Sequence, residues 1–281
     1  MVAFIAGLNG TDEDHIGYFD TAADDIARSL RELTLPVEDG FRLAIQDGWI
    51  VGVLGIEADP EIGRAWIYGP LVRHPLWQAV ADQLYAAALP AISSGIGQQQ
   101  IFCDGRNHNC RDFAARHGFE LLNESAIMTL NRADLGRVST ATAAPIDERY
   151  FGQFRALHPR LMPNSYFTPQ QILDRLGADS HLLIATHEGD LAGYVFFQAG
   201  PDVSEGYIDF VAVTETARRR GIGAQLVAAA AYSAFNWPDI VLIRLTVNTS
   251  NAPALRLYER LGFTRERTIM GFVRHTASQQ G

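Results

Sequence analysis

Apolar and polar side chains alternate with a period of two along several parts of this chain, as expected for β-strands with one buried face. In the second half, runs rich in residues that favour strands predict strands at 181–186 and 191–197. The residues between them include Glu188 and Gly189, a pair that favours a tight hairpin turn. The same reasoning predicts further strands at 206–213 and 241–247.

Two other segments of the second half have the features of helices. Residues 224–235 are rich in alanine and end before a turn that contains Pro238. Residues 253–260 begin with Pro253, which is tolerated in a first helical turn, and are followed by Gly262, a residue type common just beyond a helix. Strands and helices together predict a mixed α/β domain.

The first half repeats this order, with strands predicted at 41–46 and 49–54 around Asp47 and Gly48. A shift of 141 positions aligns the two hairpins, placing Ala44 on Ala185, Asp47 on Glu188, Gly48 on Gly189 and Gly52 on Gly193. A shift of 144 aligns Asn107 with Asn251, Arg116 with Arg260, Gly118 with Gly262 and Phe119 with Phe263. Two registers that differ by only three residues indicate a duplicated domain.

Length and composition agree with two folded domains. A chain of 281 residues exceeds the usual size of one domain, and 47% hydrophobic with 20% charged residues is typical of a folded, water-soluble protein. The polar stretch 131–144, rich in small residues, is the expected linker, so we place the domains at 1–132 and 138–281. A net charge of −9 argues against nucleic acid as a partner.

The cysteines and the apolar stretches predict the compartment. Cys103 and Cys110 lack the spacing of a metal site, and we expect free thiols and no bound metal. The start of the chain lacks the features of a signal peptide, and no apolar run is long enough to cross a bilayer. We therefore expect a cytoplasmic protein that does not associate with membranes, as a monomer or a homodimer.

The segment most informative about chemistry follows the strand 206–213. A turn with Arg218, Arg219 and Arg220 leads into a helix that starts within residues 221–223, which include two glycines. Free amides of a first helical turn, together with the helix dipole, bind anions, and glycines let the backbone approach a ligand closely. The pattern predicts a pyrophosphate site.

Two other phosphate-binding folds do not match. A P-loop requires Gly-Lys-Ser or Gly-Lys-Thr, whereas Gly223 is followed by Ala224 and Gln225. A dinucleotide fold places its glycines after the first strand of a parallel unit, whereas this turn follows a meander.

The pattern Arg218-x-x-Gly221-x-Gly223 resembles the acetyl-CoA signature of the GNAT superfamily of N-acetyltransferases. Downstream, Asn251, Ala254, Tyr258, Gly262 and Phe263 have the identities and spacing of that family's Asn-x-x-Ala-x-x-x-Tyr-x-x-x-Gly-Phe block. The resemblance covers about 140 residues of the C-terminal half. It implies two tandem GNAT domains of the α/β (α+β) class, each a mixed, mostly antiparallel sheet flanked by helices.

The resemblance also implies roles for individual residues, with acetyl-CoA as the cosubstrate and a small amine as the acceptor. CoA-binding positions are Val211, Ala212 and Val213 on the strand, Arg218, Arg219, Arg220, Gly221, Ile222, Gly223 and Ala224 at the turn, and Asn251 and Tyr258 downstream. Tyr258 corresponds to the acid that protonates the departing thiolate. Alternatively, Asn251 caps a helix and Tyr258 belongs to the core.

The general base is left open between two carboxylates. Asp209 and Glu205 lie on the strand that enters the site, where many family members place a carboxylate. Strict alternation puts both on one face with Tyr207, but in the family this strand commonly carries a bulge. Glu205 is alternatively a solvated strand end, whereas Asp209, in an apolar strand, requires a partner or a function. Further candidates are His158, His181 and His187.

The equivalent turn of the first half, 72–82, has neither a glycine pair nor an arginine cluster, and the 144 shift places Ala114 opposite Tyr258. We expect residues 1–132 to be a degenerate GNAT domain without catalysis, which shapes the acceptor cleft or covers a sheet edge.

Residues 156–170 contain three prolines with Tyr166 and Phe167 and are the expected wall of the acceptor cleft, or else a loop that packs on its own domain. The tandem organisation resembles that of mycothiol synthases. The cofactor motifs also resemble ribosomal-protein alanine acetyltransferases, which carry a glutamate where this chain has Thr246. A different alternative is a regulatory protein that binds acyl-CoA without turnover.

Overall fold

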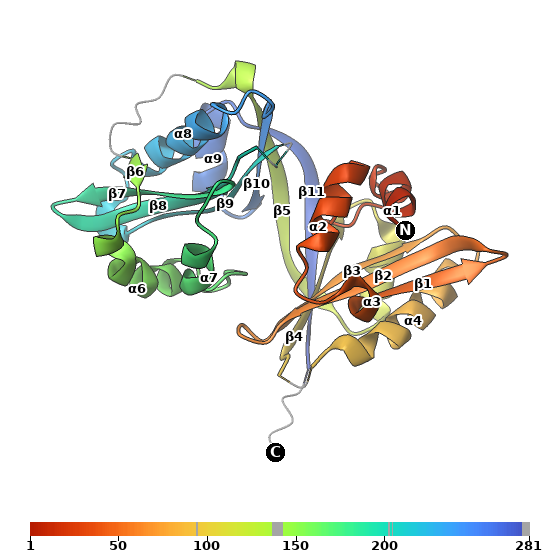
Figure 1. Ribbon diagram of the computed structural model, residues 1–281. Coiled ribbons are helices and arrows are strands. Elements are labelled where there is room, and N and C mark those ends of the chain that lie inside the picture. The colour runs from red at the N-terminus through yellow and green to blue at the C-terminus, as the bar shows by residue number, and fades with distance from the viewer. Residues whose placement is uncertain (94, 137–142, 202, 204, 277–281) are drawn as a thin grey trace. The chain divides into compact units, whose positions relative to one another are not determined.

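The computed structural model describes residues 1–93, 95–136, 143–201, 203 and 205–276 (Figure 1). Residues 137–142 of the predicted linker lie outside the described residues. Contacts divide the chain into two compact units. Unit 1 consists of Met1–Ser125 and the described residues from Thr268 onward, and unit 2 consists of Ala126–Arg267.

Unit 1 is a mixed sheet with helices on its faces. Its strand order is β1-β2-β3-β4-β11-β5, in which β1, β2 and β3 are antiparallel, β3 and β4 parallel, and β4 and β11 antiparallel. Its elements are α1 Val2–Asn9, α2 Ala23–Arg31, α3 Val37–Gly40, β1 Phe41–Gln46, β2 Trp49–Asp59, β3 Arg64–Val72, α4 Trp77–Ala88, β4 Gln98–Asp104 and α5 His108–Arg116.

Unit 2 has the same kind of sheet, in the order β6-β7-β8-β9-β10-β5-β11. From β6 to β9 each strand is antiparallel to its neighbour, and β9 runs parallel to β10. Its elements are β6 Ala143–Pro145, α6 Phe151–Leu161, α7 Pro169–Asp174, β7 Ser180–His187, β8 Asp190–Gln198, β9 Gly206–Val213, α8 Ile222–Ala234, β10 Leu242–Asn248 and α9 Ala252–Arg260. The expected mixed, mostly antiparallel sheet flanked by helices is confirmed.

Helices cover both faces of the unit 2 sheet. The core between the sheet and α8 and α9 is mostly aliphatic and includes Leu226, Val227 and Leu245. The opposite face, under α6 and α7, is aromatic and includes Phe154 and Phe196. The strand β8 is therefore buried on both sides along nearly its whole length, which explains its long apolar run. Among the described residues, no helix has the length and apolar character needed to cross a membrane.

The two hairpins of the repeat share details of backbone geometry. Asp47 and Gly48 have φ of 52° and 82°, and Glu188 and Gly189 have φ of 55° and 90°. Positive φ at both turn positions matches the right-handed twist of paired strands. The strand register shifts directly after Ala44 in the first hairpin and directly after the equivalent Ala185 in the second. This shared irregularity supports the duplication.

The two units exchange their last strands. β5, Glu120–Asn131, and β11, Thr264–His275, each run from one unit into the other. In unit 1 the neighbour of β4 is β11, and in unit 2 the neighbour of β10 is β5. Ala126, Met128 and Leu130 of β5 are buried in the core of unit 2. Each core is thus completed by a strand from the other half of the sequence.

Candidate active site

The centre of the candidate site is a gap between two parallel strands. β9 and β10 pair only from Gly206 to Ile208 and from Ile243 to Leu245. Beyond these pairs lies a cavity of about 180 Å³. It is lined by Met162, Ile208, Asp209, Val211, Leu245, Thr246, Val247, Asn248, Asn251, Ala254 and Tyr258. Side chains from β9, β10 and α9, from the chain after α6 and from the residue before α9 therefore meet where the strands part.

A β-bulge in β9 sets the direction of Asp209. Phe196 of β8 pairs with Phe210, and the next residue, Phe197, pairs with Ile208. Asp209 is thus the extra residue of the bulge, and the inside-outside alternation of β9 breaks there. Ile208 packs in the α8 face, whereas Phe210 packs in the α6–α7 face. The bulge expected from the family pattern lies at the candidate base itself.

The Asp209 carboxyl is hydrogen-bonded and half-buried in the wall of the cavity. The Tyr166 hydroxyl donates to Oδ1 over 2.6 Å, and Gln198 Nε2 lies 3.3 Å from each carboxyl oxygen. Burial raises the pKa of Asp209 to about 7, against the opposing effect of these hydrogen bonds and of the Arg175 charge. A carboxyl with this pKa exchanges a proton near neutral pH, as a general base must.

Tyr258 and Asn251 reach the same cavity from α9. Burial raises the pKa of Tyr258 to about 12, so its phenol stays protonated at neutral pH and can donate. The ring packs edge-on against Phe263 with centroids 5.7 Å apart. The Asn251 side chain accepts from the Ala254 amide at 3.3 Å, which shows the helix-capping alternative. Its amide NH₂ remains a donor beside the cavity.

The turn before α8 has the backbone of an anion-binding site. Gly221, the residue before the helix, has φ of 78°, and Arg219 has φ of 63°. Gly221 occupies the capping position of α8 but has no side chain that could accept from the first-turn amides. A Cβ on Gly223 would lie 3.3 Å from Leu257, so a small residue is needed there. Arg218, Arg219 and Arg220 are exposed beside these amides, as a phosphate group requires.

The free edge of β9 presents backbone groups to the gap. The Thr214 amide donates to the Ala192 carbonyl of β8 at 2.8 Å. Since successive residues of a strand point their N–H and C=O groups to opposite sides, Val211 and Val213 turn theirs away from β8. Ala212 points toward β8. The edge of β9 at Val211 and Val213 therefore offers unpaired backbone groups to which an extended ligand could add as a strand.

Comparison with known proteins agrees with this geometry, because residues 145–263 match the model of the Acetyltransferase (GNAT) family. Residues 145–263 form a GNAT domain. A mycothiol acetyltransferase of Arthrobacter sp. is 24% identical over 247 residues, which cover 80% of this chain and 71% of that protein. The C-terminal half thus carries an N-acetyltransferase domain of the GNAT type, and the match with that relative extends over both halves of the chain.

Two further proteins are similar to different shares of the chain. The L-amino acid N-acetyltransferase AaaT of Escherichia coli is 28% identical over 108 residues, or 38% of this chain and 65% of that protein. A tandem GNAT protein from the clavulanic acid biosynthesis pathway superposes with a TM-score of 0.66 at 16% identity, covering 98% of this chain and 93% of that chain. The latter likeness shows the tandem fold.

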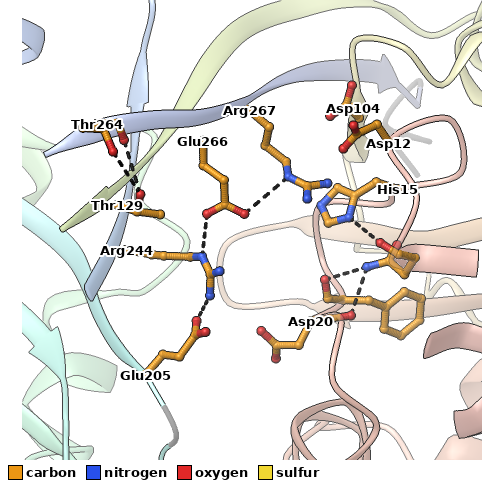
Figure 2. A network of polar contacts seen from close by, with 12 residues as sticks. Asp12, His15, Asp20, Asp104, Thr129, Glu205, Arg244, Thr264, Glu266 and Arg267 are labelled. Carbon is orange, nitrogen blue, oxygen red and sulfur yellow. Dashed lines mark hydrogen bonds and ion pairs between the residues drawn. The ribbon is translucent and has the colours of Figure 1, made fainter. Parts of the chain in front are cut away.

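The second candidate base, Glu205, lies in an ion-pair network apart from the cavity lining (Figure 2). Arg244 of β10 forms an ion pair with Glu205, and its Nε lies 2.9 Å from Glu266 Oε2. Glu205 is paired with Arg244, whereas Asp209 is bonded to Tyr166 and Gln198, so the two carboxylates do not share one environment. Of the two, the structure places only Asp209 in the wall of the cavity.

The three candidate histidines have structural contacts. His158 is buried, with Nδ1 2.7 Å from the Tyr194 hydroxyl. His181 Nε2 lies 2.7 Å from the Ala199 carbonyl, and His187 Nε2 lies 3.7 Å from Glu188 in the hairpin turn. None of the three lines the cavity formed by the described residues.

Sequence reasoning missed two partners of Asp209. Gln198 received no role, although a polar side chain at the end of the apolar run 191–197 was a signal. Tyr166 was expected in the wall of the acceptor cleft or in a loop packed on its own domain; it packs against the core of unit 2, and its hydroxyl donates directly to the carboxyl. A separate polar contact that the sequence did not indicate joins the Tyr207 hydroxyl to Thr246 Oγ1 over 2.9 Å.

The first half lacks the corresponding turn geometry as well as the motif. α4 begins after Leu76, whose φ is −91°, where α8 begins after a left-handed glycine. The Leu76 amide donates to His74 Nδ1 at 3.0 Å, so one amide before α4 is already occupied. Ala114, opposite Tyr258 in the repeat, is buried and offers no proton.

Proposed function

We propose that unit 2 transfers an acetyl group from acetyl-CoA to a primary amine of a small-molecule acceptor. The observation that carries this proposal is the cavity between β9 and β10, because a proton acceptor and a proton donor, Asp209 and Tyr258, line it together. The first-turn amides of α8 adjoin the same strand end, where a pyrophosphate is required.

The cosubstrate would be held by backbone as much as by side chains. The amides of residues 219–224 and the three exposed arginines bind the pyrophosphate, and the edge of Val211 and Val213 pairs with the pantetheine amides. The Asn251 NH₂ group adds a donor beside the cavity. The bound thioester supplies an electrophilic carbonyl carbon within the gap.

Asp209 and Tyr258 then balance the proton transfers of the reaction. The amine nitrogen forms a bond to the thioester carbon, and the carbon–sulfur bond breaks. Asp209 accepts the proton that the amine loses, and Tyr258 gives its proton to the departing sulfur. Asp209 meets this requirement in its ionised form, which prevails above about pH 7.

The relatives support an acceptor with an amino group. Two of them are a mycothiol acetyltransferase and an L-amino acid N-acetyltransferase. A cavity of about 180 Å³ suits a small group better than a folded protein surface. Thr246 lines this cavity where alanine acetyltransferases have a glutamate. This difference argues against a peptide as the acceptor.

We propose that residues 1–132 do not catalyse, so the active domain is 138–281 together with the strand that completes its core. The observations in support are the occupied Leu76 amide and the buried Ala114.

The test is release of free thiol from acetyl-CoA across amines, amino acids, aminoglycosides and N-terminal peptides. We expect turnover with one class of small amine and a reduction of kcat by about 10²-fold in Tyr258→Phe. Tyr232→Phe, an exposed tyrosine of α8, is the matched control and should retain activity. Tight CoA binding with no turnover on any amine would instead favour the regulatory alternative.

A further inference from the structure

The contacts of Asp209 lead outward to the segment between α6 and α7, which adjoins the cavity through Met162. In that segment Tyr166 is held on both sides. Its ring packs against Phe210 of β9 with centroids 4.7 Å apart and against Phe167 at 4.9 Å. Its hydroxyl donates to Asp209 Oδ1 at 2.6 Å.

His158 fixes the two residues that flank Tyr166. Its Nε2 lies 2.9 Å from Ser165 Oγ and 3.2 Å from the Phe167 carbonyl oxygen. A carbonyl oxygen only accepts, so Nε2 carries the hydrogen, and Nδ1 accepts from the Tyr194 hydroxyl at 2.7 Å. Burial lowers the pKa of His158, so the neutral ring is favoured. All polar atoms of the ring are then satisfied.

This arrangement links the acceptor wall to the proposed base. Tyr194 of β8 orients His158, His158 holds Ser165 and Phe167, and Tyr166 between them meets Asp209. A buried network in which each polar atom has a partner specifies one geometry, because breaking any contact leaves an unpaired group.

We propose that Tyr166 is a positioning residue that orients Asp209 and stabilises its ionised form, with His158 holding Tyr166 in place. The proposal rests on the proposed function for the role of Asp209 as a base, but the contact itself is independent of catalysis. A hydrogen bond donated to a carboxylate favours the charged form. The groups that face Asp209 are the Tyr166 phenol, the Gln198 amide, and the more distant charge of Arg175, with Tyr207 beside Tyr166.

Tyr166→Phe removes the donor and keeps the ring. Since a hydrogen bond to a charged group contributes about 1.5–3 kcal/mol, we expect the Asp209 pKa to rise by about one to two pH units. The acidic limb of the kcat/KM profile should move by the same amount, with the high-pH plateau reduced less than about threefold. Tyr232→Phe is the control, with no effect on either quantity.

The Asp209 titration can be read without turnover, from the carboxyl carbon signal of ¹³C-labelled aspartate, assigned with Asp209→Asn. An unchanged carboxyl titration in Tyr166→Phe would overturn the inference. A shifted titration with an unshifted kcat/KM profile would uphold the contact and instead contradict Asp209 as the base.

The part assigned to His158 is tested with His158→Gln and the double variant. If His158 acts through Tyr166, His158→Gln raises the Asp209 pKa. Adding Tyr166→Phe then gives little further rise, because both changes weaken the same hydrogen bond from Tyr166 to Asp209. Additive shifts, or no shift in His158→Gln, would contradict the role of His158. Circular dichroism of each variant separates these outcomes from loss of the fold.

Discussion

At the scale of single residues, the environment of Asp209 couples catalysis to stability. Its pKa of about 7 lies above that of an unfolded aspartate, about 3.9. The folded protein therefore favours the neutral acid. The stabilising contribution of this group is complete at low pH and is lost as the pH rises through 7. A carboxylate that serves as a base thus weakens the fold in the pH range where it works.

Asp209→Asn should reveal both effects. The amide keeps an acceptor for Tyr166 and resembles the neutral acid, so the melting temperature of the variant relative to the native protein should be higher at pH 8 than at pH 5.5. At pH 8, kcat should fall by about 10²-fold or more. Calorimetry at the two pH values and steady-state kinetics measure these quantities. A pH-independent difference in melting temperature would contradict the raised pKa.

At the scale of elements, the start of α8 depends on one backbone conformation. Gly221 has φ of 78°, a region that costs a residue with a Cβ roughly 1–2 kcal/mol. A substitution there is absorbed by changing φ, which rotates the adjacent amides away from a common point. Anion binding by a helix start requires those amides to converge. The glycine is therefore required by the ligand as well as by the turn.

Gly221→Ala should weaken CoA binding by about tenfold or more. The alanine adds strain of about 1–2 kcal/mol at positive φ, and the backbone relieves it by rotating the amides away from the anion. Gly189→Ala is a matched control, because Gly189 has φ of 90° with open space at its Cβ position, in a hairpin turn outside the cavity lining. Calorimetric titration should give one CoA per native chain. Equal affinities in the two variants, or two CoA per chain, would contradict the assignment.

At the scale of the whole molecule, the strand exchange makes the two halves depend on each other. Met128 and Leu130 of β5 are buried in unit 2, although they precede the predicted linker. Burying two such side chains contributes about 3–6 kcal/mol, a large part of the 5–15 kcal/mol that stabilises a typical domain. A C-terminal half cut at the linker lacks this contribution.

Two fragments test this dependence. Residues 126–281 keep the β5 segment of unit 2, and residues 138–281 omit it. We expect the longer fragment to bind CoA and to unfold at a higher denaturant concentration, and the shorter one to be largely unfolded or aggregated. Matched denaturation curves and CoA titrations decide the point. Equal midpoints would show that β5 is dispensable for unit 2.

Much of the fold could be predicted because it is encoded locally. The strand 206–213 coincides with β9, and the predicted helix 224–235 differs from α8 by two residues at its start and one at its end. Glycines at positive φ marked both hairpins. The bulge at Asp209 has no local signal of its own, and it came from the family resemblance. Alternation alone would have left Glu205 and Asp209 equivalent.

The sequence by itself determined the family, the turn before α8, and the segments that carry Asn251 and Tyr258, since each depends on residues close together in the chain. Only the tertiary structure decided which carboxylate lies at the cavity, because Tyr166 and Gln198 reach Asp209 from other elements. It also decided which strand completes each core. The final strands of both halves satisfy the same alternation, and only packing against a particular neighbour distinguishes their places.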